Sequence, residues 1–254
     1  MAFMELKLYS EALGMQTEVY VVIPQKQREG EIGAGAREAK EDHGYKCLYL
    51  LHGLSDDHTI WMRRTSIERY ADQYGICVVM PDAARSFYCD MKYGQKWYTY
   101  VAKELPARIR ELLRVSDRRE DNFVAGLSMG GYGALKIALR ECGSFCAGAG
   151  LSPAIDMTAR VGTSSLIPVF GEQGPVPDED DLFKLEKAVR DDPDKPRLFI
   201  GIGTEDFLYR ETQTMRRTLE EDGFDLTYRE SPGTHNWGFW DEYIRYVLEW
   251  MFGD

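Results

Sequence analysis

The sequence lacks long apolar runs and clusters of basic residues. Its longest apolar stretches, such as residues 76–80, are far too short to span a bilayer, and no basic segment followed by an apolar run opens the chain. We therefore expect a cytoplasmic protein that does not bind a membrane. Lysine and arginine form no cluster larger than pairs such as Arg118-Arg119, and the formal net charge is -11. Because phosphate binding needs a basic face, nucleic acid is not an expected partner.

Signatures of disulfides, metals and nucleotides are also missing. The chain has 5 cysteines, an odd number that fits reduced thiols better than a disulfide framework. The histidines and aspartates within residues 52–58 match none of the common zinc spacings. The G-x-G triplets at residues 33–35, 148–150 and 201–203 lack the third glycine of the dinucleotide fingerprint. We therefore expect neither a metal nor an organic cofactor.

What the chain does have is apolar content suited to one sizeable core. Apolar residues make up 44% of the 254 residues, and no linker or repeat divides them, so we expect a single domain over residues 1–254. Eight runs resemble strands, and after the third they alternate with helical stretches. These runs cover residues 5–9, 18–23, 47–51, 76–80, 123–126, 147–151, 198–201 and 226–229. The pattern predicts a mostly parallel sheet with helices on both faces, and residues 25–44 are expected to loop out between strands.

One pentapeptide, Gly126-Leu127-Ser128-Met129-Gly130, matches the G-x-S-x-G nucleophile elbow. The bare pattern is weak evidence, but residues 121–125 read as a buried strand and residues 131–140 as a helix, which is the context that the elbow requires. A nucleophile on such a tight turn needs glycine two residues away on each side. The amide of Met129, at the start of the helix, can donate to a developing oxyanion. Ser128 is therefore the candidate nucleophile, and an ordinary glycine-rich loop is the alternative.

A serine nucleophile needs a histidine base, which in turn needs a carboxylate to orient it. In the chain order typical of this elbow, the acid and the histidine both follow the serine. Only one of the four histidines, His235, follows Ser128. It lies in residues 231–238, a loop between a strand-like and a helix-like segment. His235 is therefore the predicted base.

The best candidate for the acid is Asp206. It follows the strand-like residues 197–200 and precedes a helix predicted to start near Tyr209, so it lies at the carboxyl end of a strand. The adjacent Glu205 could serve instead. The acidic run at residues 178–181 is interpreted as a solvated loop.

A second oxyanion donor is expected in the loop after the third strand. There the sequence His52-Gly53-Leu54 offers the amide of Leu54, with Gly53 letting the backbone turn and His52 bracing the loop through its ring. Of the many aromatic residues, most are expected in the core, while Trp61 and Trp237 are candidates for the substrate pocket. Cys89 is expected to be a buried packing residue.

Together these motifs resemble the esterase D family, and most closely bacterial tributyrin-type carboxylesterases. The order and spacing match over nearly the whole chain, and the resemblance rests on residues 49–58, 86–94, 97–100, 126–134, 203–206 and 233–235. It implies an α/β-hydrolase fold and a serine carboxylesterase that acts on small, short-chain acyl esters without a cofactor. It also assigns Ser128 as nucleophile, Asp206 and His235 as its partners, and the Leu54 and Met129 amides as the oxyanion hole.

The same family includes S-formylglutathione hydrolases, mycolyltransferases and feruloyl esterases, so the resemblance implies the mechanism more narrowly than the substrate. S-formylglutathione hydrolases usually carry histidine after the elbow glycines, where this chain has Tyr132, and this argues against a dedicated formylglutathione role. Residues 156–187 are expected to form a small lid or rim that helps to set acyl preference. The alternatives are an S-formylglutathione hydrolase, a feruloyl or acetyl esterase, and a noncatalytic binding module. Relatives are often homo-oligomers, so a second copy of the chain is an expected partner.

Overall fold

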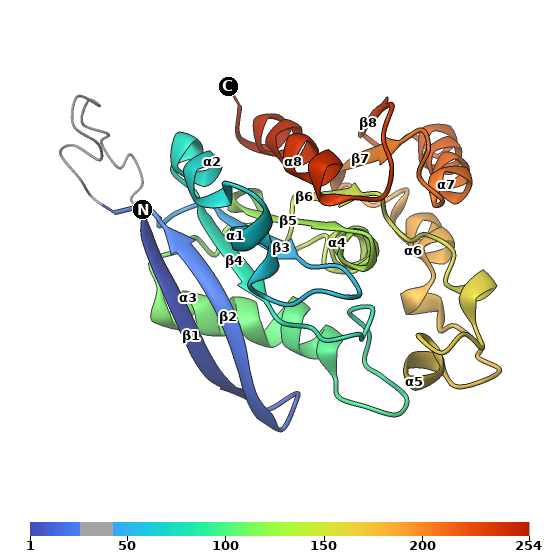
Figure 1. The fold of residues 1–254 in the computed structure, drawn as a ribbon, viewed down its shortest axis with the longest axis horizontal. Helices are drawn as coiled ribbons and strands as arrows, with labels where there is room; N and C mark the ends of the chain where they lie inside the picture. Colours follow the sequence, from blue (N-terminus) through green and yellow to red (C-terminus); the bar gives the residue numbers. More distant parts are fainter. Residues whose placement is uncertain (26–42, 254) are drawn as a thin grey trace.

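The computed structural model describes residues 1–25 and 43–253. The loop predicted over residues 25–44 therefore lies almost entirely outside the described residues. Within those ranges, eight strands form one sheet in the order β1-β2-β4-β3-β5-β6-β7-β8 (Figure 1). They are β1 (Ala2–Ser10), β2 (Met15–Ile23), β3 (Cys47–Leu51), β4 (Cys77–Pro81), β5 (Asn122–Leu127), β6 (Ala147–Leu151), β7 (Arg197–Gly203) and β8 (Leu226–Ser231). The strand predictions are confirmed, with ends displaced by no more than three residues.

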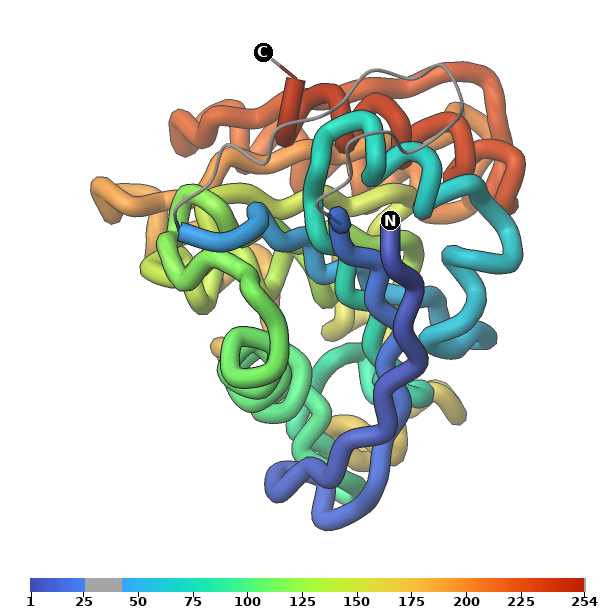
Figure 2. The backbone as a smooth tube through the Cα atoms, turned by 90° about the vertical axis from the view of Figure 1, so that its left-hand side faces the viewer, coloured from blue at the N-terminus to red at the C-terminus, as the bar shows by residue number. Residues whose placement is uncertain are grey.

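The sheet is mostly parallel, as predicted. Strands β1 and β2 form an antiparallel hairpin, and β2 pairs antiparallel with β4, whereas every pair from β4 to β8 is parallel. Figure 2 shows this hairpin, in dark blue, on the side of the molecule that faces the viewer. Glu104 holds the hairpin turn, because its carboxylate accepts hydrogen bonds from the Ser10 hydroxyl and the Glu11 and Ala12 amides.

Helices cover both faces of the sheet. They are α1 (Ile60–Arg64), α2 (Ile67–Tyr74), α3 (Leu105–Leu112), α4 (Met129–Arg140), α5 (Ile167–Phe170), α6 (Leu182–Val189), α7 (Tyr209–Glu221) and α8 (Trp237–Phe252). Alternate residues of β3 point to opposite faces. Tyr49 and Leu51 belong to the same buried cluster as residues of α3, α4 and α7, whereas Leu48 and Leu50 belong to a second cluster with residues of α1, α2 and α8. Burial on both sides explains why the central strands read as unbroken apolar runs.

Because β3, β5, β7 and β8 run in the same direction, their carboxyl ends meet at one edge of the sheet. The predicted triad residues and Leu54 lie in the connections that leave this edge. The tightest crossing is at the elbow, where a Cβ on Gly126 would overlap the carbonyl oxygen of Gly130 and a Cβ on Gly130 would lie 2.5 Å from the carbonyl oxygen of Leu51. The predicted need for glycine at both positions is confirmed.

Residues 156–187, the expected lid or rim, form most of an excursion between β6 and β7. The amides of Lys92 and Tyr93 donate to carbonyl oxygens at positions 168 and 169 of α5, over 2.8–3.0 Å. Arg160 forms an ion pair with Glu211 of α7 at 2.8 Å. The excursion is thus attached both to the loop after β4 and to α7.

Helix α6 at the end of this excursion carries a fully buried carboxyl group, Glu186. Burial, together with the neighbouring Asp222 carboxyl group, raises the pKa of Glu186 from 4.5 to about 7. The folded protein therefore keeps this group protonated over a range of pH in which the unfolded chain ionises it.

Replacing Gly126 by alanine should destabilise the fold, because Gly126 lies at the tight crossing of β5, α4 and β3 at the elbow. The added methyl group has no room between Gly130 and Leu51, and such overpacking costs about 1–3 kcal/mol. For a chain of this size we expect the melting temperature to fall by about 3–10 °C, measured by circular dichroism. Gly143→Ala is the control, because nothing lies within 4 Å of the added atom. Equal melting temperatures for the two variants would contradict the argument.

The Glu186 carboxyl group predicts a pH-dependent stability. Between about pH 4.5 and 7 the folded state binds the extra proton, so the contribution of this group to stability falls as the pH rises. Glu186→Gln cannot ionise, and we expect it to gain stability relative to wild type from pH 5 to pH 8, measured by urea unfolding. The exposed Glu179→Gln is the control. If Glu186→Gln followed the wild-type pH dependence, the shifted pKa would be wrong.

Candidate active site

Ser128 sits on a strained turn between β5 and α4. Its φ and ψ of 52° and -115° lie in a region that side chains rarely adopt. Neighbouring backbone holds this conformation: the Ser128 amide donates to the Leu151 carbonyl oxygen at 2.8 Å, and the Ser128 carbonyl oxygen accepts from Ala154 at 3.2 Å and Tyr132 at 3.0 Å. The side chain is half-buried and therefore reachable from solvent. This is the geometry expected of a nucleophile elbow.

His235 joins the other two predicted residues. The Ser128 Oγ lies 3.0 Å from His235 Nε2, and the opposite ring nitrogen, Nδ1, lies 2.8 Å from Asp206 Oδ2. An ionised carboxylate can only accept, so Nδ1 carries the hydrogen and Nε2 is free to accept from the serine hydroxyl. Three residues that are far apart in the sequence thus form one hydrogen-bonded chain.

The Asp206 carboxylate is suited to this role by its surroundings. Its side chain is fully buried, which by itself would raise its pKa. Hydrogen bonds from His235 and from the Leu208 amide, the latter at 2.9 Å, outweigh burial and hold the pKa of Asp206 below 3.8. The group is therefore ionised at neutral pH and can stabilise a positive charge on the imidazole.

The loops that carry Asp206 and His235 are fastened to each other. The Thr204 amide donates to the Ser231 carbonyl oxygen and the Glu205 amide to the Gly233 carbonyl oxygen, each at 3.0 Å. The Glu205 carboxylate accepts from the Gly233 amide, which lowers its pKa. The carboxylate of the alternative acid, Glu205, thus binds a backbone amide of the histidine loop, whereas the imidazole bonds to Asp206.

Aromatic rings frame the imidazole of His235. Trp240, which is buried, approaches it at 4.9 Å between ring centroids, and Phe207 approaches at 4.6 Å. Trp240 in turn packs against Trp237, and Trp237 against Trp61. Trp237 is partly exposed near the site, whereas Trp61 is fully buried and donates to the Leu51 carbonyl oxygen. The pocket role predicted for Trp61 therefore has no exposed surface to support it.

The loop after β3 lies directly against the serine. A Cβ on Gly53 would be 3.8 Å from Ser128 Cβ, which places the Gly53 backbone close to the Ser128 side chain. His52 braces this loop, as predicted: its Nδ1 donates to the Gly53 carbonyl oxygen at 2.7 Å, and its Nε2 accepts from the Ala83 amide at 3.0 Å. Of the two predicted oxyanion donors, Met129 follows Ser128 at the start of α4, and Leu54 follows Gly53 in the loop after β3.

Sequence reasoning missed a second support of this loop, the segment that follows β4. Ala84, Phe87 and Tyr88 all have positive φ, between 46° and 53°. Alanine, phenylalanine and tyrosine rarely adopt this conformation, so the sequence does not predict it. The Tyr88 hydroxyl donates to the His52 carbonyl oxygen at 3.0 Å. Its ring occupies the space that a side chain at Gly133 of α4 would need. The segment therefore sits between the loop after β3 and helix α4.

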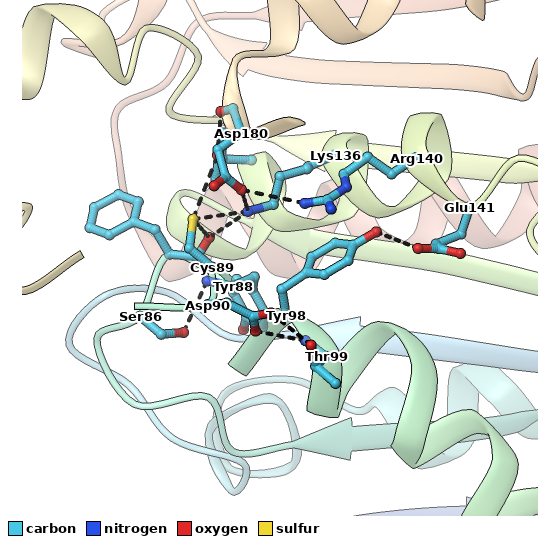
Figure 3. Close-up of polar contacts among 12 residues, drawn as sticks. Ser86, Tyr88, Cys89, Asp90, Tyr98, Thr99, Lys136, Arg140, Glu141 and Asp180 are labelled. Carbon is cyan, nitrogen blue, oxygen red and sulfur yellow. Dashed lines mark hydrogen bonds and ion pairs between the residues drawn. The ribbon is translucent and has the colours of Figure 1, made fainter. Parts of the chain in front are cut away.

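A buried polar cluster holds the other side of this segment (Figure 3). Lys136 of α4 is fully buried, and its Nζ lies 2.8 Å from Asp180 Oδ1 and 2.9 Å from Cys89 Sγ. Tyr132 donates to the Asp180 carbonyl oxygen at 2.6 Å, and Arg140 adds a longer contact to the Asp180 carboxylate at 3.6 Å. Burial raises the pKa of Cys89 to about 12, so its thiol stays protonated.

This cluster corrects one prediction. The acidic run at residues 178–181 was expected to be solvated, but only Asp178 and Glu179 are exposed, while Asp180 is buried against Lys136. A buried lysine needs a buried counter-charge, and a distant position in the sequence supplies it. The cluster joins α4, the segment after β4 and the excursion between β6 and β7.

Removing one charge of this pair should be strongly destabilising. Asp180→Asn leaves the Lys136 ammonium group buried without a full counter-charge, which costs about 3–5 kcal/mol in free energy of unfolding. The control is Asp178→Asn, which breaks an exposed pair with Lys184 and should cost less than about 1 kcal/mol. Urea unfolding at pH 7 measures both. A small effect of Asp180→Asn would show that the cluster does not secure the excursion.

The described residues contain neither a metal-binding cluster nor a membrane-spanning helix. Among residues 1–25 and 43–253, no group of three or more histidine, cysteine, aspartate or glutamate side chains is arranged to hold a metal ion. In the same part of the chain, none of the helices combines the length and apolar character needed to cross a membrane.

Comparison with known proteins shows the family to which the chain belongs. The family model Esterase, described as "Putative esterase", matches residues 10–248. The acetyl esterase of Caldicellulosiruptor saccharolyticus is 28% identical over 265 residues, covering 99% of this chain and 98% of the relative.

Two solved structures from Staphylococcus aureus are similar over their whole length. The fluorophosphonate-binding serine hydrolase F superimposes with a TM-score of 0.88 at 32% identity, covering 100% of this chain and 99% of the other. The S-formylglutathione hydrolase FrmB gives a TM-score of 0.85 at 32% identity, covering 99% and 98%. The chain therefore belongs to the Esterase family, and it is a serine carboxylic ester hydrolase with an α/β-hydrolase fold.

Proposed function

We propose that this chain hydrolyses short-chain acyl esters, with Ser128 as nucleophile, His235 as base and Asp206 as the orienting acid. The observation that carries the proposal is the hydrogen-bonded chain through His235, 3.0 Å from Ser128 Oγ and 2.8 Å from Asp206 Oδ2. A hydroxyl group becomes a strong nucleophile only when a base accepts its proton, and this arrangement supplies that base in the correct tautomer.

The reaction follows from the positions of these groups. The ester carbonyl oxygen faces the Leu54 and Met129 amides, which stabilise the negative charge that develops on it. Ser128 Oγ attacks the carbonyl carbon while His235 Nε2 takes the hydroxyl proton. The same nitrogen then protonates the departing alcohol, which leaves an acyl-enzyme on Ser128. Water, deprotonated by His235, hydrolyses this ester and regenerates the serine.

Small acyl groups are the first choice of substrate. The acetyl esterase relative, aligned over nearly its whole length, supports this choice. The excursion between β6 and β7 is proposed to form a rim that limits the acyl chain, because its Asp180 is held against α4 only two helical turns from the nucleophile.

An S-formylglutathione thioester is the second candidate, and the likeness to FrmB favours it. The tyrosine at position 132 bears less on this question than the sequence alone implied. Tyr132 is fully buried and donates to the Asp180 carbonyl oxygen, so it affects the substrate through the excursion and not by direct contact. Thioester and oxygen ester hydrolysis would use the same residues.

The test compares wild type with Ser128→Ala on p-nitrophenyl esters from acetate to octanoate, on methyl ferulate and on S-formylglutathione. We expect wild-type kcat/KM to be highest on the shortest esters and Ser128→Ala to lose about 10⁴-fold or more in kcat. Ser144→Ala, at an exposed serine beyond the end of α4, is the control and should keep wild-type rates.

Each other outcome identifies a different error. A fully active Ser128→Ala would mean that the nucleophile is another residue. A preference for S-formylglutathione or methyl ferulate would keep the mechanism and replace the substrate. Failure of wild type to turn over any of these compounds would favour a noncatalytic binding module.

A further inference from the structure

Phe207 is an exposed aromatic side chain beside the proposed base. Among the large hydrophobic residues that the structure describes, it is the most exposed, at 75%. It comes directly after Asp206 in the loop between β7 and α7. The removal of an apolar ring from water by a bound ligand is favourable. The position of the Phe207 ring next to a reactive group therefore points to a contact surface for a ligand.

The surrounding backbone fixes where this ring stands. The Asp206 carboxylate accepts from the Leu208 amide at 2.9 Å, and the Asp206 carbonyl oxygen accepts from the Tyr209 amide at 3.0 Å. Phe207 lies between these anchors. Its ring centroid is 4.6 Å from that of His235, at an interplanar angle of 49°. Since Trp240 contacts the same imidazole from the buried side, Phe207 contacts it from the solvent side.

The chemistry of acyl transfer tells which part of a substrate reaches this side. His235 Nε2 must give its proton to the departing alcohol oxygen, so that oxygen lies within hydrogen-bond distance of the imidazole. The carbonyl oxygen points instead toward the amides of Leu54 and Met129. The alcohol part of the ester therefore extends past the imidazole, where Phe207 supplies apolar surface.

We propose that Phe207 forms an apolar subsite for the alcohol part of the ester, with a preference for longer alkyl and benzyl alcohols over methanol. This inference rests on the proposed function, because it uses the proton transfer from His235. It also separates the two substrate candidates, since the charged glutathione leaving group gains little from an apolar ring.

The test varies the alcohol and the acyl group separately. The first series is methyl, ethyl, butyl and benzyl acetate, and the second is the methyl esters from acetate to hexanoate. Phe207→Ala should lower kcat/KM about tenfold for butyl and benzyl acetate and less than about twofold for methyl acetate, with the acyl series unchanged. Phe207→Leu keeps apolar surface and should retain most of the preference. Tyr9→Ala, another exposed aromatic, is the control and should change neither series.

Three results would overturn the subsite. An equal loss on all esters would mean that Phe207 only positions the imidazole. A loss that grows with acyl length would place the ring in the acyl site. No change on any ester would mean that the ring contacts no substrate.

A binding measurement separates this inference from the proposed function. Benzyl alcohol is titrated into Ser128→Ala and into the double variant Ser128→Ala, Phe207→Ala, and binding is followed by saturation-transfer NMR. Binding that disappears in the double variant supports the subsite even if wild type hydrolyses none of the esters. Equal binding, or none to either protein, would overturn the inference.

Discussion

The crossing of β5, α4 and β3 at the elbow is the constraint on which the rest of the structure depends. Gly126 and Gly130 let three backbones approach more closely than any side chain permits, and Ser128 is left with positive φ at the point of closest approach. Backbone hydrogen bonds to β6 and to the residues after it offset that strain. The same crossing places Ser128 at the N-cap of α4, directly before the first-turn amides of that helix, so the proposed nucleophile and one proposed oxyanion donor come from a single local geometry.

The other parts of the site are held in place around this crossing by contacts between segments that are distant in the sequence. Two backbone hydrogen bonds join the loops after β7 and β8, and they hold Asp206 and His235 close to each other. On the opposite side, the Tyr88 hydroxyl and the His52 ring hold the loop after β3 through hydrogen bonds to its carbonyl oxygens. The Lys136–Asp180 pair then links α4 to the excursion between β6 and β7. The attraction within such a buried pair largely offsets the cost of desolvating both charges, so removal of one partner costs far more than the pair itself contributes.

Much of this could be predicted from the sequence, because the relevant signals are local or ordered along the chain. Apolar runs located the strands among the described residues, the glycines indicated the elbow, and chain order left His235 as the one histidine that follows Ser128. What could not be predicted depends on partners distant in the sequence. Nothing near Asp180 indicates a buried lysine across the fold, and nothing near Trp61 indicates that it is fully covered. The positive φ of Tyr88 and the exposure of Phe207 are likewise consequences of tertiary packing, invisible to periodicity and composition.

The central claim is that His235 activates Ser128. The most direct measurement is the rate of covalent labelling by a fluorophosphonate, with the modified residue identified by peptide mass spectrometry, in wild type and in His235→Ala. This probe reports the nucleophile without any assumption about the natural ester. We expect one adduct per chain, on Ser128, and labelling slowed about 10³-fold or more when the imidazole is removed. An adduct on another residue, or labelling of Ser128 at the wild-type rate in His235→Ala, would contradict the proposed activation of Ser128 by His235.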